Sequence, residues 1–129
     1  MRLLLDTQAF VHLVRDPTAL PDVARSAIED PANDLLLSLA SPWEIQVKVM
    51  LGKLTLGKPL RESIQTELDR GTFALLPITL IHIDALSRLP SHHRDPFDRI
   101  LVAQAIHESL TLVSGDHQVR LYPIPCLWD

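Results

Sequence analysis

Four acidic residues in this 129-residue sequence stand beside segments whose patterns mark the ends of secondary-structure elements. Asp6 and Asp116 each follow an apolar, strand-like run, whereas Glu44 and Asp98 each lie in the first turn of a segment with helical spacing. Carboxylates that lie close together either share protons or bind a hard divalent cation. What these acids can do therefore depends on the elements that position them.

The longest predicted helix begins at Asp95. This residue is a good N-cap, Pro96 suits the first helical position, and Asp98 is expected to reach back to the free amides of the first turn. Apolar residues then recur with the one-sided spacing of a helix that packs on a sheet. We therefore predict a helix over 96–109 that leads directly into a strand at 110–113.

Short apolar runs alternate with helical patterns along the rest of the chain. We predict strands at 3–5, 34–39, 73–78 and 110–113, and a short edge strand in the tail after 122. The helices expected between them cover 7–14, 20–29, 41–51, 60–70 and 79–89, with Ser41 and Thr79 as N-caps. This alternation predicts an α/β fold with a parallel sheet of four to five strands and helices on both faces.

A parallel sheet of this kind brings the four acids to one edge, because its functional crevice lies beyond the carboxyl ends of the strands. Asp6 and Asp116 follow strands directly, and Glu44 begins the helix that leaves the second strand. The helix from Pro96 runs antiparallel to the strand that it precedes, so its first turn, with Asp98, reaches the same edge. We expect the four carboxylates to share one site.

Taken one at a time, each acid also has a purely structural interpretation. Glu44 can complete a capping box with Ser41, and Asp6 can cap the helix that follows it. Asp98 suits the dipole of its helix, and Asp116 suits an Asx turn. Their joint placement favours a shared site, because crowded carboxylates repel one another unless a proton or a cation intervenes. An oxygen-only cluster selects Mg²⁺ or Mn²⁺, the ions that assist phosphodiester hydrolysis.

The composition limits the class of protein. A chain of 129 residues with 47% apolar composition is long enough for one buried core, so we expect a single domain over 1–129. The net charge of −4 excludes nucleic-acid binding by overall charge alone. Cys126 is the only cysteine, which excludes an internal disulfide and fits a reducing compartment. No apolar run approaches the ~20 residues of a membrane span, so we expect a soluble, cytoplasmic protein.

The motifs around these acids carry a family resemblance. The sequence resembles the PIN-domain ribonucleases of the VapC-like toxins in type II toxin–antitoxin pairs. The matching motifs are Leu-Leu-Leu-Asp-Thr at 3–7, Ser-Pro-Trp-Glu-Ile at 41–45 with Lys48, Leu-Gly-Lys-Leu at 51–54, Ser-Gly-Asp at 114–116 and the long block at 92–105. Together they span nearly the whole chain, and the long block is the most specific of them.

The resemblance implies an Mg²⁺-dependent endoribonuclease, with Mn²⁺ as a possible substitute. By resemblance, Asp6, Glu44, Asp98 and Asp116 are the catalytic, metal-binding acids and Ser114 is a supporting hydroxyl. It also implies arrest of growth by cutting a cellular RNA, a cognate antitoxin that blocks the site, and a homodimer.

Two further positions in the matched motifs bear on the site. Asp95 also falls within the motif, where we interpret it as a cap first and a metal ligand second. Relatives often carry His at the position of Gln8, which puts a substrate contact in doubt more than the metal.

Five further polar residues are candidates for contact with substrate phosphates: His92, His93, Arg94, Arg99 and Lys48. For the two histidines, a solvated loop is the competing interpretation, and for Lys48 it is an ion pair with Glu44 one helical turn away. Lysines and an arginine at 53, 58 and 61 are candidates for an RNA-binding rim or for ordinary surface. Trp43 and Phe97 are expected in the core.

Two other function classes compete with a nuclease. A phosphoacceptor signalling domain also places acids at strand ends, but it needs a lysine after a late strand, and residues 114–117 supply none. A catalytically silent PIN-fold module, which acts through protein or RNA contact, is the second alternative. The presence of all four acids argues against it.

Overall fold

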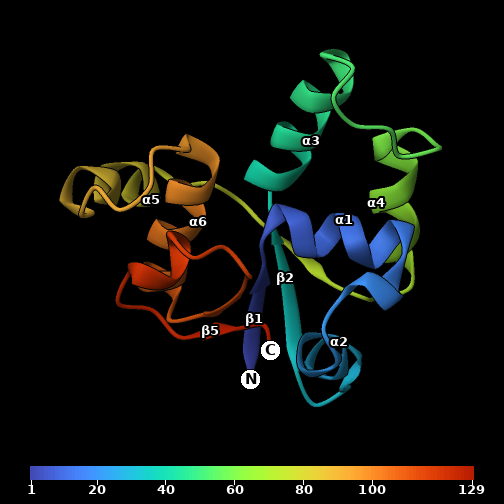
Figure 1. The fold of residues 1–129 in the computed structure, drawn as a ribbon, viewed down its shortest axis with the longest axis horizontal. Coiled ribbons are helices and arrows are strands. Elements are labelled where there is room, and N and C mark those ends of the chain that lie inside the picture. Colours follow the sequence, from blue (N-terminus) through green and yellow to red (C-terminus); the bar gives the residue numbers. More distant parts are fainter.

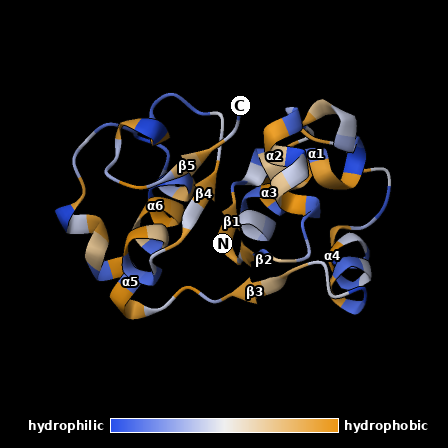
Figure 2. Ribbon diagram, turned by 90° about the horizontal axis from the view of Figure 1, so that it is seen from below, coloured by the Kyte–Doolittle hydropathy of each residue, from blue (hydrophilic) through white to orange (hydrophobic).

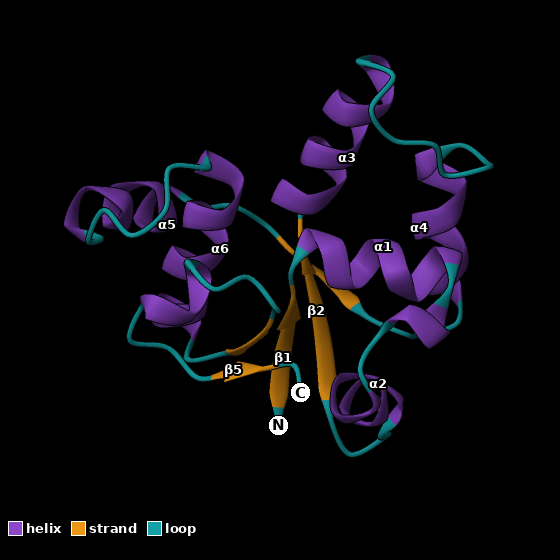
Figure 3. Ribbon diagram, viewed as in Figure 1, coloured by secondary structure: helices purple, strands orange, loops and turns teal.

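The computed structural model describes residues 1–129, and its centre is a five-stranded parallel sheet in the order β3-β2-β1-β4-β5 (Figures 1 and 3). The strands are β1 (Arg2–Leu5), β2 (Asp34–Ser38), β3 (Ala74–Leu76), β4 (Thr111–Val113) and β5 (Cys126–Leu127). The predicted α/β class, the parallel pairing and the short C-terminal edge strand are confirmed.

Six α-helices connect the strands and cover both faces of the sheet. They are α1 (Thr7–Arg15), α2 (Asp22–Glu29), α3 (Ala40–Met50), α4 (Leu60–Asp69), α5 (Leu80–Ala85) and α6 (Pro96–Glu108), with short 3-10 turns at Pro17–Ala19, Leu86–Arg88 and Val119–Leu121. Helices α1, α2 and α4 lie on one side of the sheet and α5 and α6 on the other (Figure 1). None of the helices has the length and apolar character that a membrane crossing requires.

Alternation along the strands divides the core into two layers. Leu3 and Leu5 of β1 face the cluster that includes Phe10 of α1, whereas Leu4 faces the cluster that includes Leu101 of α6. All of these side chains are fully or almost fully buried. Figure 2 shows the hydrophobic residues concentrated along the strands and on the sides of the helices that face them. This packing holds the carboxyl ends of β1 and β4 together.

The predicted start of α3 is wrong. The helix begins at Ala40, one residue before Ser41, and Leu39 precedes it without a side-chain cap. The hydroxyl of Ser41 instead lies 3.0 Å from the hydroxyl of Thr7, in the buried contact between α3 and α1. The capping box of Ser41 with Glu44 does not form, so Glu44 is free for other contacts.

Other boundaries differ by a few residues for local reasons. β3 is shorter than predicted because Pro77, which follows it, cannot donate to a strand ladder. Trp43 is 60% exposed, so its predicted place in the core is wrong; it packs edge-on against Phe97 at 4.9 Å between ring centroids. Thr79 caps α5 as predicted, and α6 ends at Glu108, followed by the C-cap Ser109, which is left-handed with φ 57°.

Candidate functional site

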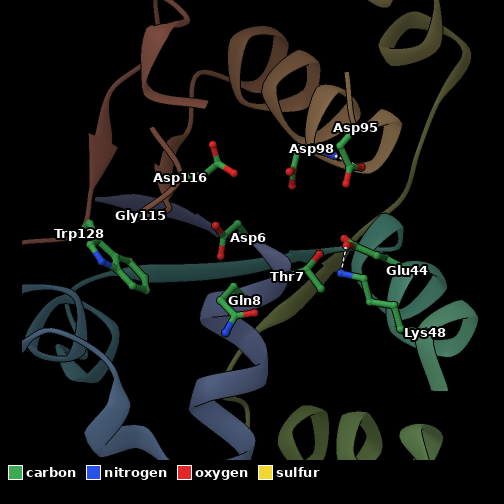
Figure 4. Close-up of a pocket in the computed structure, with 10 residues that line it drawn as sticks. All are labelled: Asp6, Thr7, Gln8, Glu44, Lys48, Asp95, Asp98, Gly115, Asp116 and Trp128. Atoms are coloured by element: carbon green, nitrogen blue, oxygen red, sulfur yellow. Dashed lines mark hydrogen bonds and ion pairs between the residues drawn. The ribbon is translucent and has the colours of Figure 1, made fainter. Parts of the chain in front are cut away.

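A cleft of about 430 Å³ lies beyond the carboxyl ends of β1 and β4 (Figure 4). Its lining is almost entirely polar, with a single hydrophobic side chain. The lining residues are Asp6, Thr7, Gln8, Glu44, Lys48, Asp95, Asp98, Gly115, Asp116 and Trp128. The structure therefore brings together all four acids that the sequence singled out, although they come from segments far apart in the chain.

Asp6 is held at the junction of β1 and α1. Its amide donates to the carbonyl of Val113 at 3.1 Å, and one carboxylate oxygen caps α1 by accepting from the amide of Ala9 at 2.7 Å. Burial raises the pKa of Asp6, the hydroxyl of Ser114 and the Ala9 amide lower it, and the charges of Asp116 and Glu44 raise it again. The net pKa is raised, so this carboxylate is costly to ionise without a nearby cation.

Glu44 enters the cleft from the first half of α3, and only 4% of the residue is exposed. Its Oε2 accepts from Nζ of Lys48 at 2.7 Å, the ion pair expected one helical turn apart. This hydrogen bond is the largest cause of a raised pKa at Lys48. The other oxygen, Oε1, is buried and has no hydrogen-bond partner. Because buried polar atoms normally have a hydrogen-bond partner, the set of contacts around Glu44 is incomplete.

Asp95 and Asp98 occupy the N-terminus of α6 in different roles. Asp95 is the N-cap, and its Oδ1 accepts from the amides of Phe97 and Asp98 at 2.8 and 3.3 Å. The prediction that Asp98 also reaches back to cap the helix is wrong, because its carboxylate points towards His93 instead. Burial raises the pKa of Asp98 to about 7, with further increases from the charges of Asp95, Glu44 and Asp6 and an opposing effect of His93.

Asp116 sits in the Asx turn that the sequence offered as its structural interpretation. Its Oδ1 accepts from the amides of Gln118 and Val119 at 2.8 and 3.2 Å, and its own amide donates to the buried hydroxyl of Ser114 at 3.2 Å. Burial raises the pKa of Asp116, but the Val119 and Gln118 amides and the contact with His93 outweigh it, so the pKa is lowered. Asp116 thus ionises more readily than Asp6 or Asp98.

His93 bridges two of the acids. Its Nε2 lies 2.9 Å from Oδ2 of Asp98 and 3.4 Å from Oδ2 of Asp116, and the three possible ligand atoms fall within 4.8 Å of one another. Its Nδ1 accepts from the amide of Asp95 at 3.1 Å. Because a backbone amide can only donate, the ring proton of the neutral imidazole is on Nε2. His93 is therefore a donor to the carboxylates in this arrangement rather than a free nitrogen ligand.

Of the other candidate phosphate contacts, Lys48 lines the cleft, whereas His92, Arg94 and Arg99 do not. His92 is exposed and packs edge-on against Tyr122 at 5.0 Å, and Arg94 is exposed. The guanidinium of Arg99 donates to the carbonyls of Leu86, Pro90 and His93 and to the Tyr122 hydroxyl. This geometry uses Arg99 to fix the loop that carries His93, not to face a substrate.

Gln8 lines the cleft, and its amide nitrogen lies 3.0 Å from a ring nitrogen of His12. Two further residues of the lining are Gly115, which only matched a motif in the sequence, and Trp128, for which the sequence indicates no more than an anchor near the end of the chain. Trp128 follows β5, whose pairing with β4 is a long-range contact that no local pattern reveals. The sequence offered only an aromatic residue near the end of the chain as a signal.

The residues present fit a divalent cation. The donor set consists of carboxylate oxygens, the ligands that Mg²⁺ and Mn²⁺ prefer. Glu44 leaves one buried oxygen unpartnered, and Asp98 has a pKa near neutrality because of burial and its acidic neighbours. A cation in the cleft relieves both costs at once.

Comparisons with known proteins agree with this fold. The family model described as PIN domain matches residues 3–124. VapBC2 from Rickettsia felis, solved bound to a DNA fragment from their promoter, aligns with a TM-score of 0.69 at 18% identity over 100% of both chains. FitAcB from Neisseria gonorrhoeae aligns at 0.63 and 19% over 96% of this chain and 95% of that one. VapBC-1 from nontypeable Haemophilus influenzae aligns at 0.66 and 16% over 98% and 96%. No curated protein matches the sequence significantly.

Proposed function

Since the chain belongs to the PIN domain family, we propose that it is a metal-dependent endoribonuclease that hydrolyses RNA phosphodiester bonds. The observation that carries this proposal is the convergence of Asp6, Glu44, Asp98 and Asp116 in one polar cleft. The mutual repulsion of these carboxylates also supports the proposal. Four carboxylates with one lysine beside them are poorly compensated for a purely structural arrangement.

Asp6, Asp98 and Asp116 would hold Mg²⁺ or Mn²⁺ directly, and Glu44 would act directly or through a water. Such an ion, when bound, polarises the scissile phosphate and lowers the pKa of a water molecule. Asp95 would remain the helix cap first and would be a metal ligand second.

The chain's own residues orient this cluster. The Ala9 amide fixes the rotamer of Asp6, and the amides of residues 118 and 119 fix that of Asp116. Ser114 connects the two acids, because its hydroxyl bonds both Asp6 and the amide of Asp116. With its proton on Nε2, His93 would release the carboxylates and donate to a phosphate oxygen of the substrate. Lys48 limits the negative charge at Glu44.

We further propose that this nuclease is the toxin of a toxin–antitoxin pair, with a cytoplasmic location, a homodimeric state and an antitoxin partner that covers the cleft. The solved structures with a similar fold include VapBC and FitAB complexes, one of them bound to a promoter fragment. They support a protein partner for this chain. A catalytically silent PIN-fold binding module is the alternative function, and the two differ in whether purified protein cuts RNA.

The test is incubation of purified protein with a single-stranded RNA, with Mg²⁺, with Mn²⁺ or with EDTA. We expect cleavage with either metal, none with EDTA, and a loss of at least about 100-fold in Asp6→Asn and Asp98→Asn. Asp22→Asn is the matched control, because its carboxylate is 90% exposed on α2 and faces solvent. Cleavage in EDTA, or equal cleavage by all variants, would remove the proposal; intact RNA under every condition would favour the silent module.

A further inference from the structure

Trp128 is the one apolar side chain in the lining of an otherwise polar cleft. It lies beside Gly115 at one end of the cleft, and Glu44 and Lys48 lie at the other (Figure 4). The side chain is half-buried, with part of its surface on the hydrophobic core and part on the cleft. The proposed hydrolysis of a phosphodiester does not use this residue, so its presence in the lining needs another explanation.

The backbone around Trp128 holds it firmly. Leu127, the residue before it, pairs with Val113 of β4, and its carbonyl accepts from the amide of Ser114 at 3.1 Å. The carbonyl of Trp128 accepts from the amide of Ala24 at 3.2 Å. The indole is therefore fixed relative to β4, the strand that leads to Asp116.

The indole packs directly against the backbone of Gly115. A Cβ added at Gly115 would lie 2.6 Å from both Cε2 and Nε1 of Trp128, closer than real Cβ contacts come. Only glycine at this position, next to Asp116, lets the ring approach the acidic end of the cleft.

The charge of the cleft shows what this ring can contribute. Five carboxylates and one lysine line the cleft, so the protein alone repels a phosphate chain. Stacking of a base on an aromatic ring supplies affinity that does not depend on charge. Bases in a duplex are already stacked on their neighbours, whereas unpaired bases are free to stack on a side chain.

We infer that Trp128 is a stacking platform for an unpaired base next to the scissile phosphate. This inference rests on the proposed function, since it places the phosphate at the acids and the neighbouring base on the indole. It assigns Trp128 to substrate binding and Gly115 to positioning the ring.

The fluorescence of Trp128 itself can test this inference. The chain has two tryptophans, so in a Trp43→Phe variant the emission comes from Trp128 alone. Titration of this variant with a short single-stranded RNA, with Ca²⁺ in place of Mg²⁺ and the RNA checked for integrity, should quench the emission saturably. An oligonucleotide of the same length without bases, and a fully paired duplex, should quench it far less.

Substitutions at Trp128 distinguish stacking on an aromatic ring from the mere presence of a large apolar side chain. Trp128→Leu should weaken RNA binding by about 5- to 150-fold, the range for stacking of one base, and Trp128→Phe by less, because it keeps an aromatic face. Trp43→Leu is the matched control, since Trp43 is exposed and outside the cleft lining, and it should bind as the wild type does. Gly115→Ala, which displaces the indole without changing it, should weaken binding in the same way even if Trp128→Leu fails to fold.

Equal quenching by the RNA and the base-free chain, or unchanged binding in Trp128→Leu and Gly115→Ala, would overturn the inference. The nuclease proposal fails separately. Quenching by RNA that is never cut with Mg²⁺ supports the platform and removes the nuclease. Wild-type cleavage and binding by Trp128→Leu keeps the nuclease and removes the platform.

Discussion

Replacement of Asp98 by asparagine should stabilise the metal-free protein at neutral pH. The pKa of Asp98 is raised from 3.8 to about 7 by burial and by the charges of neighbouring acids. A carboxyl whose pKa is higher in the folded state contributes stability that is fully present below pH 3.8 and is lost as the pH rises through 7. Asparagine does not titrate and avoids this loss. Asp98 does not cap its helix, since Asp95 does, so no cap is removed with it.

The size of the stabilisation by Asp98→Asn follows from the raised pKa of Asp98. Full ionisation of Asp98 at pH 7.5 costs at most about 4 kcal/mol, at about 1.36 kcal/mol per pH unit between the two pKa values. The side chain is 20% exposed, so solvent screens part of the repulsion, and the variant also weakens the contact with His93. We expect a net stabilisation of about 1–2 kcal/mol, or roughly 3–10 °C in Tm for a domain of this size.

The assay is thermal unfolding in EDTA, followed by circular dichroism, at pH 4.5 and pH 7.5. The difference in Tm between Asp98→Asn and the wild type should be large and positive at pH 7.5 and should shrink towards pH 4.5. Asp22→Asn, which removes an exposed acid, controls for net charge and should show little difference at either pH. A lower Tm of Asp98→Asn at pH 7.5, or the same difference at both pH values, would show that the carboxylate is a structural group and that the crowding argument is wrong.

Three further predictions test other parts of the account. Mg²⁺ or Mn²⁺ at 100-fold excess over Kd should stabilise the wild type by about 2.7 kcal/mol and so raise its Tm, and it should raise the Tm of Asp98→Asn much less. A wild-type Tm that neither metal changes would contradict the fit of the site. Lys48→Met should lower the stability in urea unfolding by about 1–2 kcal/mol, because it leaves Glu44, which is 4% exposed, without its cation; an unchanged midpoint would mean that the ion pair does not stabilise the fold. Ser109→Gly should raise stability by about 0.5–1 kcal/mol in the same assay, because residue 109 has φ 57°, and a loss would mean that the serine side chain makes an unrecognised contact.

The arrangement of the acids was predictable because it follows from topology. Asp6 and Asp116 directly follow apolar runs, and a parallel sheet fixes which end of each run faces the crevice. The i, i+4 spacing of Glu44 and Lys48 likewise allowed their ion pair to be expected, and it forms. These features depend only on the order of elements and on local spacing, both of which can be read along the chain.

Two side chains that suit helix caps make other contacts in the structure. Ser41 has the chemistry of an N-cap, but the packing of α3 on α1 uses its hydroxyl against Thr7. The spacing from Asp95 to Asp98 suits a capping box, but Asp98 turns to His93. The contact of Ser41 joins segments far apart in the chain, and that of Asp98 depends on how the loop before α6 folds, so the spacing of residues along a helix predicts neither.

The contacts of His93 with two acids and the place of Trp128 in the cleft lining were not predicted either. Nothing in the sequence distinguishes His93 from the adjacent His92. In the structure, His93 differs because it accepts from the amide of Asp95 and lies near Asp116. Trp128 reaches the cleft through the pairing of β5 with β4, a strand of two residues with no alternating pattern of its own. Short edge strands give the weakest signal in a sequence and here deliver a side chain to the site.

The most direct test of the site is the position of a bound metal. Crystals of the protein grown or soaked with Mn²⁺, measured near the manganese absorption edge, should show an anomalous peak in contact with carboxylate oxygens of Asp6, Asp98 and Asp116. His93 should then have moved its Nε2 away from Asp98. No peak in the cleft at saturating Mn²⁺, with His93 still bonded to both carboxylates, would contradict the claim that these acids form a divalent-cation site.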